Sequence, residues 1–159
     1  MITGCLYFIS SWFLYHSIEY LLHSLGHSHR YGYHIYKIHK NHHTIHYPST
    51  NLLSNEYRTN LIYGLSEGVV IYSPPVMIIF LSLYPLVKIN TFLIISSELL
   101  FIAFISDYLH SQIHLNGSWL EKYKWFQDKR KEHFIHHKYT TKNMNIMDMT
   151  MDKLNKTYK

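Results

Sequence analysis

Residues 91–114 read TFLIISSELLFIAFISDYLHSQIH, an apolar run that ends in two regularly spaced histidines. The part from Thr91 to Tyr108 contains only two charged residues and approaches the ~20 apolar residues that a membrane-spanning helix needs. His110 and His114 follow it four residues apart, a spacing that puts both imidazoles on one side of a helix. The stretch therefore predicts a spanning helix with two candidate metal ligands at its mouth.

Histidines recur at related spacings elsewhere in the chain. His23 and His27 share the four-residue spacing, and two further rows have the form His-x-x-His-His. Together the four rows contain ten of the fourteen histidines: His23, His27, His39, His42, His43, His110, His114, His133, His136 and His137. Because imidazole is a ligand for Fe, Zn, Cu and Ni, two matched pairs of rows predict one compact site with more than one metal ion. His29, His34 and His46 are interpreted as solvent-facing.

Two other long apolar runs complete the predicted fold. They cover residues 2–22 and 61–86, and Pro74 and Pro75 are expected to bend the second run. With the run at 91–108, we predict an all-α integral membrane protein with about three transmembrane helices, formed as one domain over residues 1–159. Residues 23–60 and 110–159 would form a histidine-rich helical cap. A cleaved signal peptide is not expected, because no basic residue precedes the first run and no small-residue cleavage site follows it.

Connectivity and charge both place the four rows on one side of the membrane. Two rows follow the first predicted span and two follow the third, so an even number of crossings separates them. All but one of the fifteen Lys and Arg residues lie on the histidine side, and the exception is Lys88. The positive-inside rule then predicts a metal site on the cytoplasmic side.

Two acidic residues near the rows are candidates for orienting metal-bound rings. Asp107 precedes His110 by three residues and His114 by seven, so all three share a helix face. Glu19 precedes His23 by four and could accept a hydrogen bond from its ring. A partner of this kind fixes the tautomer and orientation of a metal ligand. An interfacial glutamate near water is an equally good interpretation of Glu19.

Shorter helices are expected in the polar parts of the chain. One should run through residues 36–46 and carry the second row. Ser118 and Glu121 match a capping box, so another helix should begin there and carry the fourth row at its end. The methionine-rich tail from Asn143 onward fits either a short helix or a frayed end.

Several classes of protein are excluded by what the sequence lacks. Cys5 is the only cysteine, so disulfides and thiolate-rich zinc sites are excluded. The His-Glu-x-x-His motif of zinc peptidases, the glycine-rich phosphate loop and the nucleophile elbow are absent. The net charge of +5 is not accompanied by a nucleic-acid-binding motif, so no nucleic-acid partner is expected.

The histidine pattern resembles the fatty acid hydroxylase superfamily, which includes sterol desaturases, sterol methyl oxidases and sphingolipid hydroxylases. The residues that carry the resemblance are His23-x-x-x-His27, His39-x-x-His42-His43, Asp107-x-x-His110-x-x-x-His114 and His133-x-x-His136-His137. The similarity extends from about residue 15 to residue 158 and is strongest over residues 116–138.

The resemblance implies a non-haem centre of two iron ions (Fe) in a multi-pass membrane protein of the endoplasmic reticulum or a similar membrane. Such a centre uses O₂ and two electrons to hydroxylate or desaturate a lipid acyl chain or a sterol. It also implies a separate electron donor such as cytochrome b5 and its reductase, because the sequence contains no fused donor domain. We favour hydroxylation, since it needs only one positioned carbon atom.

Two other functions stay open on the sequence alone. One is a non-catalytic metal-binding membrane protein with the same ligands. The other is a membrane-surface module whose basic helix, with Lys129, Arg130 and Lys131, binds anionic lipid. In the second case these basic residues would matter and the histidines would not.

Overall fold

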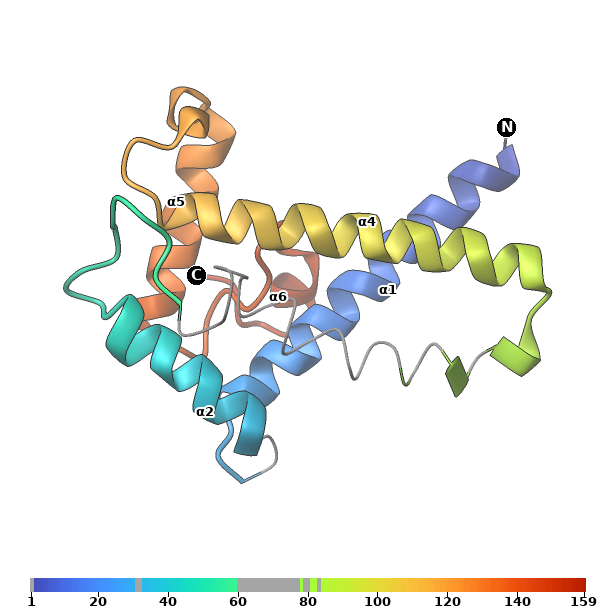
Figure 1. Ribbon diagram of the computed structural model, residues 1–159, viewed down its shortest axis with the longest axis horizontal. Helices are drawn as coiled ribbons and strands as arrows, with labels where there is room; N and C mark the ends of the chain where they lie inside the picture. The colour runs from blue at the N-terminus through green and yellow to red at the C-terminus, as the bar shows by residue number, and fades with distance from the viewer. Residues whose placement is uncertain (1, 31–32, 60–77, 79–80, 83) are drawn as a thin grey trace.

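The computed structural model describes residues 2–30, 33–59, 78, 81–82 and 84–159. Two helices of 25 residues dominate it: α1 (Ile2–Gly26) and α4 (Ile89–Ile113). They pack against each other and cross at an angle, with α1 running diagonally behind α4 in Figure 1. At 1.5 Å per residue, each is about 37 Å long. The described chain is helical and forms no strand, which confirms the predicted all-α class within these residues.

Shorter helices gather at the C-terminal ends of α1 and α4. They are α2 (Tyr33–Asn41), the π-helical turn η1 (His42–His46), the 3-10 turn η4 (Trp119–Lys122), α5 (Lys124–Lys138) and α6 (Thr150–Leu154). A further 3-10 turn, η3 (Tyr84–Leu86), precedes α4. In Figure 1, α2 and α5 close the left side of the molecule, while α6 lies between α1 and α4. Each of the four histidine rows therefore lies in or next to this group of helix ends.

Only α4, among the described helices, is long and apolar enough to cross a membrane. Its outer face leaves Leu100, Phe101 and Phe104 about two-thirds exposed. Helix α1 instead carries polar side chains along its length, and Ser11 and Glu19 use theirs to contact α4. The predicted span at 61–86 falls almost entirely outside the described residues. The structure thus supports one candidate span, and the predictions for residues 2–22 and 61–86 stay predictions.

Polar side chains join the two long helices in their middle. Ser11 Oγ donates to Glu98 Oε2 over 2.7 Å, and Ser106 Oγ donates to Glu19 Oε1 over 2.7 Å. A carboxylate at membrane depth is expected to face protein partners. The crossing of α1 and α4 is therefore fixed by hydrogen bonds as well as by apolar packing.

The local predictions are confirmed with changes of detail. The helix expected at 36–46 begins earlier, at Tyr33, and becomes a π-helical turn from His42. Ser118 Oγ accepts a hydrogen bond from the Leu120 amide, but the turn it begins is 3-10, and the α-helix starts only at Lys124. The tail forms the five-residue helix α6, so it is not frayed.

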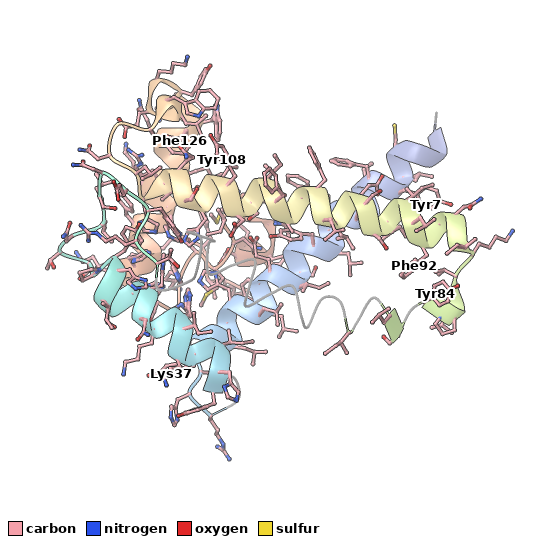
Figure 2. The ribbon with its side chains drawn as sticks, in the orientation of Figure 1. Tyr7, Lys37, Tyr84, Phe92, Tyr108 and Phe126 are labelled. Carbon is pink, nitrogen blue, oxygen red and sulfur yellow. The ribbon has the colours of Figure 1, made fainter. Side chains whose placement is uncertain are left out.

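An apolar core fixes α5 against the end of α4. It consists of Ile113, Leu120, Phe126 and Ile146. Figure 2 shows Phe126 and Tyr108 where α5 meets α4, far from Tyr84 and Phe92 at the other end of that helix. Because α5 carries the fourth histidine row, this core determines where that row lies.

Candidate metal centre

The four histidine rows meet in two adjoining groups. The first group consists of His23, His27, His39, His43 and His136, and the second of His42, His110, His114 and His133. Within each group the ring nitrogens lie within 4.8 Å of one another. Nine of the ten predicted ligands are therefore in a group. The tenth, His137, adjoins the second group, because its Nε2 lies 3.1 Å from Nε2 of His133.

Two of the rows supply one group each, and the other two rows supply both groups. The row on α1 supplies only the first group, and the row on α4 supplies only the second. The rows on α2–η1 and on α5 supply both. The change from α-helix to π-helix at His42 accompanies this division, since His39 and His43 reach the first group while His42 reaches the second. Single π-helical turns of this kind are frequent at functional sites.

Nitrogen–nitrogen distances in the first group are short enough for the rings to share an ion. His39 Nε2 lies 3.0 Å from Nε2 of His23, of His27 and of His43. His136 Nε2 lies 3.1 Å from those of His27 and His43. Two nitrogens that are each ~2.1 Å from one ion are ~3.0 Å apart at a 90° angle and ~3.4 Å apart at a tetrahedral angle. Ring nitrogens at these spacings can bind one shared ion.

Backbone carbonyl groups fix the tautomers of four rings. His136 Nδ1 donates to the Lys142 carbonyl over 2.7 Å, and His23 Nδ1 donates to the Met144 carbonyl. In the second half of the site, His137 Nδ1 donates to the Tyr47 carbonyl over 2.8 Å and His114 Nδ1 to the Leu52 carbonyl over 2.9 Å. A carbonyl oxygen can only accept, so each Nδ1 carries the proton. In a neutral ring, Nε2 then carries a free lone pair, and in His23, His136 and His114 this atom lies next to ring nitrogens of the same group.

Burial keeps these rings neutral. Desolvation is the largest cause that lowers the pKa of His39, His43 and His136 well below the ordinary value, and nearby histidines lower it further. Burial also lowers the pKa of His137 to about 3 and that of half-buried His27 to about 4. Converging lone pairs without protons repel one another, and a metal cation satisfies them all at once. The donor set therefore fits bound metal ions.

Glu19 does not have the role predicted for it. Its carboxylate is buried and accepts hydrogen bonds from His16 Nδ1 at 3.0 Å, Ser106 Oγ and Asn145 Nδ2. The ring of His23 is held by the Met144 carbonyl instead. Both the bond to His23 and the water-exposed interfacial position are wrong, because α1 turns Glu19 toward α4 and the tail.

The predicted role of Asp107 concerns the rings of His110 and His114. His114, one of its two expected partners, has its Nδ1 held by the Leu52 carbonyl. Orientation of His110 by Asp107 stays a prediction. The backbone groups that do orient rings, at Tyr47, Leu52, Lys142 and Met144, carry no sequence pattern, because every residue has a carbonyl.

The histidines outside the rows differ in their exposure to solvent. His29 and His34 are exposed, in agreement with the prediction. His46 is 6% exposed, so its predicted solvent-facing position is wrong, and its carbonyl accepts a hydrogen bond from Arg58. His16, on the buried face of α1, pairs with Glu19.

Within the described residues, the fold and site together define a helical protein with one candidate membrane span and a buried, paired histidine centre suited to metal ions. The family model described as fatty acid hydroxylase matches residues 8–157, nearly the whole chain. The chain therefore belongs to the fatty acid hydroxylase family. Neither the curated proteins nor the solved structures contain a match to it.

Proposed function

We propose that this protein is a membrane oxygenase that hydroxylates a lipid acyl chain or a sterol with O₂ at a centre of two iron ions. The observation that carries the proposal is the pair of adjoining histidine groups with inward-directed nitrogens. Family membership supports oxidation of a lipid. Imidazole is a ligand for iron, and the two groups offer places for two ions.

The bound metal would supply the oxidising power that attack on an unactivated C–H bond requires. The chain's own residues have more limited tasks. The ring nitrogens hold the ions, and the carbonyl groups of Tyr47, Leu52, Lys142 and Met144 hold the rings. Burial lowers the pKa of the rings, so that they would offer unprotonated nitrogens to the ions at neutral pH. The proposed balance is R–H + O₂ + two electrons + two protons giving R–OH + water, with the electrons from a separate carrier such as cytochrome b5.

The surface beside the C-terminal end of α4 supports a position at the membrane–water boundary. Trp119 Nε1 donates to Tyr108 Oη over 2.8 Å, and Trp119 and Trp125 are 58% and 50% exposed. Lys122 lies over the rings of Trp119 and Tyr123. Exposed Trp and Tyr with neighbouring lysines are typical of the headgroup layer of membranes. In this arrangement the metal ions would lie near the cytoplasmic surface of an endoplasmic-reticulum-like membrane.

A lipid-profile experiment tests the reaction. The protein is expressed with cytochrome b5 and its reductase under ¹⁸O₂, and the lipids are analysed by mass spectrometry. We expect one ¹⁸O atom in a lipid product, lost in His136→Ala and kept in His29→Ala, which replaces an exposed histidine outside both groups. Loss of two hydrogens without added oxygen would identify a desaturase instead. A fully metallated protein that changes no lipid would indicate a non-catalytic metal-binding protein.

A further inference from the structure

The tail from Lys142 to Lys159 meets the first histidine group at two neighbouring carbonyls. The Lys142 carbonyl accepts from His136 Nδ1, and the Met144 carbonyl accepts from His23 Nδ1. Between them, Asn143 has a φ of 51°, in the left-handed region that asparagine tolerates better than most residues. This turn lets two carbonyls only two residues apart serve two rings on different helices, α5 and α1.

The carboxylate of Asp152 accepts hydrogen bonds from the backbone of this turn. Its side chain is fully buried. Oδ1 accepts from the Met144 amide at 2.7 Å and from Thr157 Oγ1 at 2.7 Å, and Oδ2 accepts from the Asn145 amide at 2.9 Å. Hydrogen bonds to a carboxylate are roughly twice as strong as neutral ones. The amide groups on both sides of the Met144 carbonyl are thus fixed by one side chain.

Further bonds join the same turn to the rest of the molecule. Asn143 Nδ2 donates to the Glu132 carbonyl and Asn143 Oδ1 accepts from the Lys159 amide, both over 2.9 Å. Asn145 Nδ2 donates to the His16 carbonyl and to Glu19 Oε2. The turn is therefore attached to α5, to α1 and to the last residue of the chain.

We propose that Asp152 is a positioning residue for the first metal ion, acting through the Met144 carbonyl on the ring of His23. The inference rests on the proposed function, since it assumes that the first group binds metal. Rotation of the His23 ring would turn Nε2 away from the group centre, and the Met144 carbonyl opposes that rotation. Changes to such outer partners typically cost ~10–100-fold in metal affinity.

Replacing Asp152 with Asn gives a test with little change of volume. The new amide group would face the amides of Met144 and Asn145 with a donor in place of one acceptor. Purified protein in detergent is titrated anaerobically with Fe(II), in a His114→Ala background that disables the second group. We expect Asp152→Asn to weaken Fe(II) binding by ~10–100-fold. The matched control is Asp148→Asn, whose carboxylate bonds Trp12 and Thr150 and no part of the turn.

Each outcome has a distinct meaning. Selective weakening by Asp152→Asn, with fewer nitrogen neighbours around the iron by X-ray absorption, supports the proposal. Equal affinity in Asp152→Asn and Asp148→Asn overturns it and leaves the proposed function intact. Failure of the parent His114→Ala protein and of the unaltered protein to bind Fe(II) overturns both. If Asp152→Asn does not fold, Thr157→Val removes one donor to the same carboxylate, and we expect a smaller loss in the same direction; no loss overturns the proposal.

Discussion

The two histidine groups lie side by side, yet they are supported from different parts of the chain. In the first group, two rings are oriented by carbonyls of the C-terminal tail, and the buried carboxylate of Asp152 lies behind them. Beside the second group, the orienting carbonyls belong to the segment after η1. Arg130 supports that side, because its Nη2 donates to the carbonyls of Gln112 and Leu115 next to His114. The acidic side chain of Asp152 thus supports the first group, and the basic side chain of Arg130 supports the second.

Because the supports differ, we expect metal affinity at the two groups to be separable even though their rings interleave. His43 and His137, from different helices, stack with ring centroids 4.1 Å apart. Despite this contact, the outer partners of the two groups share no residue among those described above. Substitutions behind one group, or of a ligand in one group, should therefore leave the other largely unchanged, whereas substitutions that displace α5 as a whole should affect both.

The largest expected effect comes from removing one ligand from each group. His136→Ala and His133→Ala should each lower product formation by more than ~100-fold, beyond the effect of outer-partner changes. Each should also lower bound iron from two ions per chain to one, measured by elemental analysis after anaerobic purification. Loss of both ions from either variant would show that the two groups are not independent.

A core substitution should act on both groups equally. Phe126 is 1% exposed and packs α5 against the end of α4. Phe126→Ala should reduce the free energy of unfolding by about 3–5 kcal/mol, the range for large-to-small changes of a buried aromatic. In denaturant titrations of the metal-loaded protein, both ions should be lost in one step with unfolding. Loss of one ion well before the other would contradict a shared support on α5.

A change behind the second group should be smaller and selective. Arg130→Met keeps apolar volume over the Phe126 ring but removes the hydrogen bonds to Gln112 and Leu115. We expect a loss of stability of about 2 kcal/mol and a ~10-fold weaker second Fe(II) step. The neighbouring exposed change Lys131→Met serves as the control. An equal effect of Arg130→Met on both Fe(II) steps would remove the distinction between the two supports.

The smallest expected effect concerns pH in the metal-free protein. Burial lowers the pKa of His27 to about 4 and of His137 to about 3, while the unfolded value is about 6.5. As pH falls from 7 to 5.5, the unfolded chain takes up protons and the folded chain does not. Stability is therefore fully present above pH 6.5 and falls by about 1 kcal/mol per such histidine over this interval.

Chemical denaturation at several pH values measures this slope. His27→Gln in the first group and His137→Gln beside the second should reduce it by similar amounts, because both pKa values are depressed. Stability that is constant or increases toward pH 5.5 would contradict the burial of neutral rings.

The sequence predicted the rows because helical spacing is a local property. Four-residue spacings at His110 and His114 were sufficient to place both rings on one side of α4. Assignment of rings to groups was not predictable, because it depends on the π-helical turn at His42 and on how α5 meets α4. The position of Glu19 was not predictable for a similar reason: of its partners His16 and Asn145, the second is 126 residues away in the sequence.

The backbone carbonyls that orient the rings could not be predicted from the sequence either. Any residue can offer a carbonyl, so nothing marked Leu52 or Met144 before the fold was known. The methionine-rich tail contains two acidic residues, Asp148 and Asp152, and nothing in the sequence distinguishes them. Only the fold shows that three donors from the tail converge on Asp152.

The division of adjacent histidines between the two groups has a consequence for the distance between the metal ions. His42 and His43 are joined by a single peptide bond, yet they belong to different groups, and the neighbours His136 and His137 are divided in the same way between the first group and the margin of the second. Consecutive Cα atoms are held ~3.8 Å apart by covalent geometry. Two peptide units, one in η1 and one in α5, thus each connect a ring of the first group to a ring in or beside the second. A displacement of η1 or of α5 should consequently move rings on both sides of the centre together, because the two rings of each neighbouring pair share one backbone segment.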